Sequence, residues 1–315
     1  MKKIFNKISA SIVYGIFYPI SLLPFCVLYA IADFEYYIIY YLIRYRRKVV
    51  RNNLVTSFPE KSEEEIKQIE KKFYHWFADY FFESIKLLSI SDKELRKRFI
   101  LINPEEITEF FKVDRNVSAI LGHYCNWEWL SCCGLGQKED EPVALVYHPL
   151  YNYAFDRLFY RLRHRLVNGI PIPKNEILRY LIKCKQEGTH YLCGLISDQA
   201  PKWENIHLWV PFLNHDTPVF TGAERLMKKF NNAVFYLETS RPKRGYYTCT
   251  YHFITDDANN LPEHEITRRF FQMLEKTIQR QPEYYLWTHN RWKRTHEEFD
   301  RRFKVVNGKV IPRDK

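Results

Sequence analysis

Val117-Ser118-Ala119-Ile120-Leu121-Gly122-His123 is the stretch that decides the fold of this chain. Its first five residues form an apolar run that ends at a glycine, a pattern typical of a buried β-strand. After the histidine, Asn126 is a suitable helix N-cap, and Glu128 would lie in the first turn of that helix. The sequence therefore predicts an imidazole at the end of a sheet strand, with a carboxylate one short turn beyond it.

The spacing of His123 and Glu128 predicts that the two side chains act together. A carboxylate that hydrogen-bonds one ring nitrogen fixes the tautomer and makes the other nitrogen a better base for an alcohol proton. The spacing alone is weak, because a surface histidine beside a helix-capping glutamate gives the same pattern. Its place after a strand and a glycine favours a functional site, since open α/β sheets bind ligands at their strand ends.

Other chemistries fit this segment less well. The zinc metalloprotease pattern His-Glu-x-x-His does not occur in the chain. Cys125 could be a nucleophile, but a free cysteine is more often a small buried apolar residue. No glycine-rich dinucleotide or phosphate loop is present, so we expect neither a nucleotide cofactor nor a metal.

The rest of the chain alternates apolar strand patterns with helical ones. We expect strands at 143–147, 191–196, 233–237 and 246–253, and helices at 62–88, 152–167, 175–186 and 263–280. This alternation predicts an α/β fold, with a mainly parallel mixed sheet flanked by helices. The length of 315 residues suits one large α/β domain with an appendage.

The N-terminal region predicts a helical membrane anchor. Residues 8–32 carry no charged side chain, and at about 1.5 Å per residue they could cross a hydrocarbon core about 30 Å thick. Pro19 and Pro24 interrupt the run and would bend a helix. An aromatic stretch at 34–45 then leads into basic residues up to Lys48, as in a lipid headgroup region. We therefore expect residues 1–48 to form the anchor.

Several arrangements of this anchor remain open. Positive charge lies on both sides of the apolar run, so a single span and a re-entrant segment with both ends cytoplasmic are both consistent with it. A signal peptide lacks support, because no small-residue cleavage site follows. A buried hydrophobic helix of the main domain is the remaining alternative.

Net charge and cysteine content narrow the class of protein. A net charge of +11 with 17% aromatic residues suits nucleic acid, an anionic membrane surface or an acidic substrate. Seven cysteines at no zinc-like spacing favour a reducing compartment.

The block from Gly122 to Glu128 resembles the first conserved block of the bacterial lipid A late acyltransferases, of the lauroyl and myristoyl type. These belong to the wider His-x4-Asp/Glu glycerolipid acyltransferase superfamily, in which glutamate is typical of the lipid A branch. Similar blocks cover nearly the whole chain in the expected order. Upstream lie Asn53-Leu54 and Phe58-Pro59-Glu60, and downstream follow Arg165-x3-Gly169 with 170–173, Asp198-Gln199-Ala200-Pro201, Val210-Pro211-Phe212, Thr217-Pro218, Thr221-Gly222-Ala223, Tyr285-Leu286-Trp287 and Arg291-Trp292-Lys293. One departure is Leu213-Asn214, where the family often has Phe-Gly.

This resemblance implies a reaction and its partners. A fatty acyl group would pass from an acyl carrier protein thioester to a hydroxyl of a lipid A precursor, on the cytoplasmic side of the bacterial inner membrane. Residues 49–315 would be the acyltransferase domain. His123 would be the general base, worth about 10²–10⁴ in rate, and Glu128 would orient it and stabilise the imidazolium.

Two further residues are candidates for substrate binding. Arg165 could grip a phosphate of the acceptor in bidentate fashion, whereas a solvated basic face explains Arg157, Arg161 and Arg163 at least as well. Asp198, at the end of a predicted strand, could hold Arg165 or a sugar hydroxyl, or it could simply cap a turn. The sequence does not identify the donors that would stabilise an oxyanion.

Two alternatives to lipid A acylation remain. One is acyl transfer to another membrane lipid or glycan hydroxyl, such as that of a glycerophospholipid or an ornithine lipid. The other is a basic membrane-bound protein that binds nucleic acid or anionic lipid, which the ordered blocks argue against. We therefore expect no nucleic acid partner.

Overall fold

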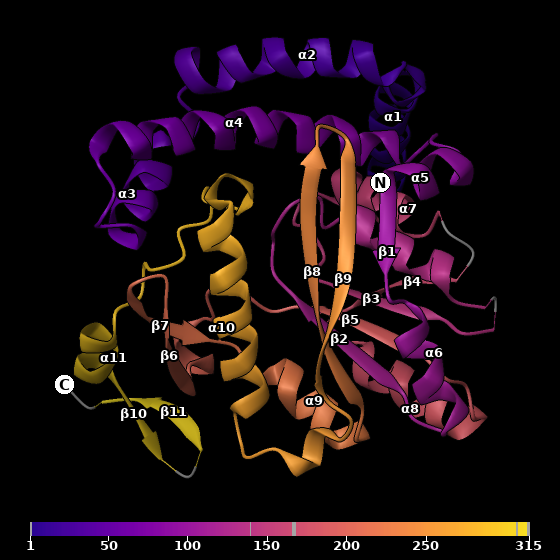
Figure 1. The fold of residues 1–315 in the computed structure, drawn as a ribbon, viewed down its shortest axis with the longest axis vertical. Helices are drawn as coiled ribbons and strands as arrows, with labels where there is room; N and C mark the ends of the chain where they lie inside the picture. The colour runs from indigo at the N-terminus through magenta and orange to yellow at the C-terminus, as the bar shows by residue number, and fades with distance from the viewer. Residues whose placement is uncertain (1, 139, 166–167, 307, 314–315) are drawn as a thin grey trace.

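A seven-stranded sheet forms the centre of the computed structural model, which describes residues 2–138, 140–165, 168–306 and 308–313 (Figure 1). The strand order is β1-β9-β8-β2-β5-β3-β4, and all neighbours are parallel except β8 and β9. The strands are β1 Phe99–Ile102, β2 Val117–Leu121, β3 Val143–Tyr147, β4 Gly169–Pro173, β5 Leu192–Ile196, β8 Ala233–Lys243 and β9 Tyr246–Thr255. The predicted α/β class with a mainly parallel mixed sheet is confirmed.

Helices flank this sheet and two small hairpins lie beside it. The α-helices are α1 Lys2–Leu22, α2 Phe25–Tyr37, α3 Arg47–Ser57, α4 Glu63–Lys86, α5 Asp92–Arg98, α6 Glu105–Lys112, α7 Tyr153–Arg163, α8 Ile177–Glu187, α9 Gly222–Phe230, α10 Glu265–Arg280 and α11 His296–Arg302. A π-helix, η1 Ile38–Leu42, extends α2, and short 3₁₀ helices are η2 Trp129–Gly136, η3 Trp203–Asn205, η4 Ala258–Asn260 and η5 Pro282–Tyr284. The hairpins pair β6 Leu208–Phe212 with β7 His215–Val219, and β10 Phe303–Val306 with β11 Lys309–Pro312.

Local sequence signals account for most of the element boundaries. Ser62 and Glu65 form a reciprocal capping box at the start of α4. Asn152 caps α7 through its side-chain oxygen, and Gly188 ends α8 with a positive φ of 65°. Helix α7 ends at Arg163, before the predicted end at 167, and residues 166–167 lie outside the described part of the chain.

The segment after His123 is not the α-helix that the sequence predicts. Its chain turns sharply through Cys125, whose φ is +51°, and then enters the 3₁₀ helix η2. The Asn126 side-chain oxygen still accepts a hydrogen bond from the Trp129 amide at 3.3 Å, as an N-cap would. A short turn therefore connects the histidine to Glu128.

Strand β2, which ends two residues before His123, is buried along its whole length, and α10 packs closely over its end. All five residues of β2 are buried between β5 and β8. A Cβ atom on Gly122 would lie 2.8 Å from a methyl group of Leu274, which is on α10. Glycine at this position therefore allows α10 to pack directly over the end of β2.

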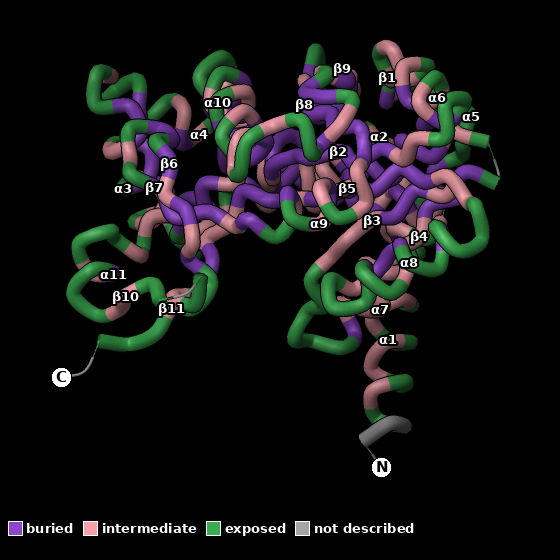
Figure 2. Tube along the Cα trace, turned by 90° about the horizontal axis from the view of Figure 1, so that it is seen from below, coloured by how far each residue is buried: buried purple, intermediate pink, exposed green. Residues whose placement is uncertain are grey.

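The N-terminal apolar run is divided between two helices. The chain breaks at Pro24, as predicted, whereas Pro19 lies inside α1. Helix α2 lies along α4, and α1 extends away from the body of the protein (Figures 1 and 2). Within the described residues, one helical stretch is long and apolar enough to cross a membrane, namely Phe25–Leu42, of which 22% is buried in the protein. By itself this is weak evidence for an anchor, because a core helix passes the same test.

Candidate active site

His123 and Asp198 meet at the ends of two adjacent parallel strands. Strands β2 and β5 pair in register, with Leu121 opposite Ile196, so the residues that follow them emerge side by side. The Asp198 carboxylate lies 2.6 Å from the ring Nδ1 of His123 and also accepts a hydrogen bond from the His123 backbone amide at 3.1 Å. The histidine is thus fixed by one carboxylate at both its ring and its backbone.

The predicted partnership between His123 and Glu128 is corrected by this geometry. Glu128 is buried and instead accepts two hydrogen bonds from Arg163 of α7, at 2.7 and 2.8 Å. The sharp turn at Cys125 and the lack of a regular helix change the direction in which the Glu128 side chain points. Arg163 is therefore an ion-pair partner and does not belong to a solvated basic face.

Burial and neighbouring charges shift the pKa values of Asp198 and Arg163. Burial of Asp198 favours its neutral form, but the charge of His123 and the hydrogen bonds from it outweigh this effect and hold the pKa of Asp198 below its usual range. Burial likewise opposes the charge on Arg163, but Glu128 more than compensates and raises the pKa of Arg163. The surroundings of Asp198 therefore favour its ionised form, and those of Arg163 favour the charged guanidinium.

The free ring nitrogen of His123 is the atom that could act on a substrate. Its Nε2 lies 3.2 Å from the side-chain nitrogen of Gln199, and the side chain is 17% exposed. If Asp198 accepts the proton on Nδ1, Nε2 carries a lone pair and can accept from Gln199 or from a hydroxyl. Trp127 packs edge-on to the imidazole at 5.1 Å, and Tyr80 of α4 packs on Trp127 at 4.2 Å. An aromatic wall therefore borders the base.

A second cluster of polar groups surrounds Asp198. Burial lowers the pKa of His289 to about 4, which leaves its imidazole neutral at pH 7. Burial also lowers the pKa of Arg291 to about 10, and this guanidinium donates to the Pro218 carbonyl at 2.7 Å. Tyr285 is buried beside Asp198, and burial together with that carboxylate raises the pKa of the phenol. Tyr285 and Arg291 belong to the C-terminal blocks quoted above, and His289 lies between those blocks.

Arg165 does not lie with the other predicted site residues. Its guanidinium pairs with Asp92 at 2.9 Å and donates to the Ile90 carbonyl. Of the partners considered for Asp198, Arg165 is therefore not the one observed, since Asp198 pairs with His123 and Arg165 pairs with Asp92. Arg165 instead ties the end of α7 to the start of the basic helix α5.

The cysteine and metal chemistries gain no support from the structure. Cys125 is buried, and burial raises the pKa of its thiol far above the usual range. Among the described residues, no group of three or more His, Cys, Asp and Glu side chains is arranged to hold a metal ion.

The sequence contains a signal for one further site residue, Gln199, but none for Arg163. Gln199 follows Asp198 directly, so it shares the same strand end and the same resemblance block. Arg163 gives no such signal, since three arginines lie close together on one amphipathic helix and the sequence does not show which one faces inward.

Comparison with known proteins shows the family of this chain. A family model for bacterial lipid A biosynthesis acyltransferases matches residues 3–294. The chain is 22% identical over 253 residues to a lipid A biosynthesis palmitoleoyltransferase of Escherichia coli (strain K12), covering 80% of each protein. It is also 22% identical over 296 residues to a lipid A biosynthesis lauroyltransferase of the same organism, covering 92% of each. The chain belongs to the bacterial lipid A biosynthesis acyltransferase family.

Proposed function

We propose that this protein is an O-acyltransferase that moves a fatty acyl group from an acyl carrier protein thioester to a hydroxyl of a lipid A precursor. The observation that carries the proposal is the His123–Asp198 pair, 2.6 Å apart at a strand end, with the second ring nitrogen of His123 left for an acceptor hydroxyl. The names of the two relatives support the acceptor class. A thioester is already activated, so no covalent enzyme intermediate and no cofactor is needed.

The proposed reaction takes place at the Nε2 atom of His123. The acceptor hydroxyl replaces Gln199 at Nε2 and gives its proton to that nitrogen as its oxygen attacks the thioester carbon. A new C–O bond forms, the C–S bond breaks, and the imidazolium returns the proton to the departing thiolate. Asp198 holds the required tautomer and stabilises the imidazolium while it exists.

Glu128 keeps a place in the proposed site, but with a different partner. Its two hydrogen bonds to Arg163 fasten the turn after His123 to α7. We propose that this ion pair positions residues 123–128, called the catalytic turn below. We also propose that Arg165, with the basic residues of α5, binds an anionic group of the acceptor.

The N-terminal helices are the proposed means of reaching a membrane-embedded acceptor. We propose residues 1–48 as the anchor and 49–315 as the acyltransferase domain, with the site on the cytoplasmic side of the inner membrane. Large apolar side chains on one flank of α1 are exposed, namely Phe5, Ile8, Ile12 and Ile16. Exposed side chains beyond Pro24 add Phe34, Tyr37, Leu42 and Ile43. Such a surface is costly in water and favourable at a lipid interface.

An in vitro acylation assay tests the proposed function. Purified protein in detergent would receive a panel of acyl carrier protein thioesters and a tetra-acylated lipid A precursor, with products identified by mass spectrometry. We expect one added acyl chain and loss of transfer in His123→Ala. Normal turnover by His123→Ala would refute the mechanism. If the acyl chain is transferred only to a glycerophospholipid, an ornithine lipid or a glycan, that molecule is the acceptor in place of the lipid A precursor.

A further inference from the structure

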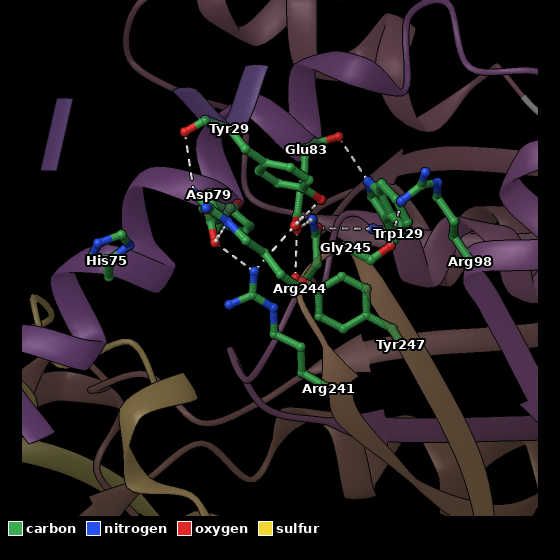
Figure 3. Close-up of polar contacts among 12 residues, drawn as sticks. Tyr29, His75, Asp79, Glu83, Arg98, Trp129, Arg241, Arg244, Gly245 and Tyr247 are labelled. Atoms are coloured by element: carbon green, nitrogen blue, oxygen red, sulfur yellow. Dashed lines mark hydrogen bonds and ion pairs between the residues drawn. The ribbon is translucent and has the colours of Figure 1, made fainter. Parts of the chain in front are cut away.

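A fully buried carboxylate behind the candidate active site has no role in the mechanism above. Glu83 lies on α4, and its side chain is 1% exposed. Figure 3 shows it at the centre of a polar cluster that joins α2, α4 and the β8–β9 hairpin to the turn before η2. A buried ionised group is costly unless it is fully paired, so its partners indicate its purpose.

Four donors converge on the two oxygens of this carboxylate. One oxygen accepts from the Tyr29 hydroxyl at 3.0 Å and lies 3.5 Å from the Arg241 guanidinium. The other accepts from the Asn126 amide at 3.1 Å and from the Tyr247 hydroxyl at 2.5 Å. All four partners donate to the carboxylate, and the Asn126 and Arg241 nitrogens cannot accept a hydrogen bond in return.

The same residue holds a second point of the catalytic turn. The Glu83 backbone carbonyl accepts from the Trp129 indole at 2.8 Å, while Asn126 caps the Trp129 amide. Asn126 and Trp129 are both completely buried. Glu83 therefore holds Asn126 and Trp129 in place. These two residues follow His123 in the chain and enclose Glu128.

Neighbouring charges keep the cluster balanced. Asp79, one turn before Glu83 on α4, pairs with Arg241 at 2.6 Å and with Arg244 at 2.6 Å. The buried acids Asp79 and Glu83 thus face Arg241 and Arg244, which lie at the end of the β8–β9 hairpin. Burial raises the pKa of Glu83, while Arg241 and the hydrogen bonds from Tyr247 and Asn126 act in the opposite direction.

We infer that Glu83 is a positioning residue for acyl transfer, which acts through Asn126 and Trp129 to hold the turn between His123 and Glu128. This inference rests on the proposed function for its kinetic test. Displacing a catalytic group by about 1 Å costs about 100-fold in rate. A small shift of this turn would therefore strongly reduce the rate of the reaction at His123. The residue itself touches neither His123 nor a substrate.

Glu83→Gln is the direct test, and Glu70→Gln is its matched control. Glu70 is also a buried glutamate of α4 and is also paired with arginines, Arg47 and Arg51, but it has no contact with the catalytic turn. We expect Glu83→Gln to lower kcat by about 10- to 100-fold with KM nearly unchanged, and Glu70→Gln to leave kcat within about threefold of the parent. Equal effects of the two substitutions would overturn the inference.

A double-mutant cycle separates positioning from general destabilisation. If Glu83 acts through Asn126, then Glu83→Gln should add no more than about a threefold loss of kcat to Asn126→Ala. Glu83→Gln combined with Glu70→Gln should instead show the product of the single effects. Independent, multiplicative losses from Glu83→Gln and Asn126→Ala would overturn the inference.

Two further measurements keep the test decisive. If Glu83→Gln does not fold, Glu83→Asp keeps the charge beside Arg241 and withdraws the carboxylate by about 1.5 Å, and the same loss of kcat is expected. Amide hydrogen exchange over 122–131 needs no activity at all. Faster exchange there in the Glu83 variant than in Glu70→Gln supports the inference even if the wild-type protein acylates no lipid A, and equal exchange overturns it.

Discussion

Arg163 grips Glu128 with two hydrogen bonds, 2.7 and 2.8 Å long, across 35 residues of sequence. Glu128 is 3% exposed and Arg163 is 19% exposed, so the pair is largely withdrawn from water. Bidentate geometry of this kind is specific to a guanidinium and cannot be reproduced by an ammonium group. The ion pair fastens α7 to the catalytic turn, which makes it a structural tie as well as a part of the site.

Removing Arg163 should therefore destabilise the protein. Arg163→Ala leaves Glu128 buried without a partner, and we expect the free energy of unfolding to fall by about 3–5 kcal/mol. Urea denaturation followed by tryptophan fluorescence measures this change. Arg161→Ala, on the exposed side of the same helix, should change stability by less than about 1 kcal/mol. Similar losses of stability in Arg163→Ala and Arg161→Ala would show that the ion pair with Glu128 contributes no more to stability than an exposed arginine does.

Asp198→Asn should affect the reaction more than the fold. An asparagine in this place favours the wrong tautomer of His123 and cannot stabilise the imidazolium, so kcat should fall by about 10³–10⁴-fold. Initial rates of acyl transfer with saturating substrates measure the loss. Glu128→Gln serves as the comparison, because Glu128 pairs with Arg163. A larger loss of kcat in Glu128→Gln than in Asp198→Asn would restore Glu128 as the partner of the base.

Asp198 pairs with His123 and Glu128 does not, and this difference shows how far the sequence predicts the site. Strands β2 and β3 match their predicted limits, because each is a short apolar run between breakers. The sequence identifies His123, Glu128 and Asp198 as candidates, but it pairs His123 with Glu128, whereas the structure pairs it with Asp198. Strand order decides that β5 lies next to β2, and this long-range pairing leaves no local mark in the chain.

Some features had no readable signal at all. The β8–β9 hairpin runs beyond the predicted strands because its polar tip, with Arg241 and Arg244, pairs with Asp79 of α4. Leu213-Asn214, which departs from the family's usual Phe-Gly, adopts positive φ values of 50° and 63° in a tight β6–β7 hairpin. Asparagine suits that conformation, whereas leucine is tolerated there because its amide donates to Glu275 at 2.8 Å.

The partly buried His289 predicts a dependence of stability on pH. Its pKa is about 4 in the folded protein and near 6.5 in the unfolded chain, so the unfolded state binds more protons between these values. Stability should therefore fall as the pH drops from 6.5 to 4, by up to about 3 kcal/mol from this residue. Thermal unfolding from pH 7 to 4 measures it. His289→Gln should flatten the dependence of stability on pH, and an unchanged curve in this variant would contradict the assigned pKa.

The exposed apolar surface of the N-terminal helices should bind lipid. Phe34 is 67% exposed and Leu42 is 78% exposed, and both lie within the stretch Phe25–Leu42. Replacing both with serine removes two large apolar groups from the proposed membrane face without disturbing the core, so binding to vesicles should weaken by at least about tenfold. Flotation with phosphatidylglycerol-containing vesicles measures the bound fraction. Val113→Ser, at an equally exposed valine outside these helices (66%), is the matched control. If the control weakens flotation as much as the double variant, the binding face lies elsewhere and residues 1–48 are not the anchor.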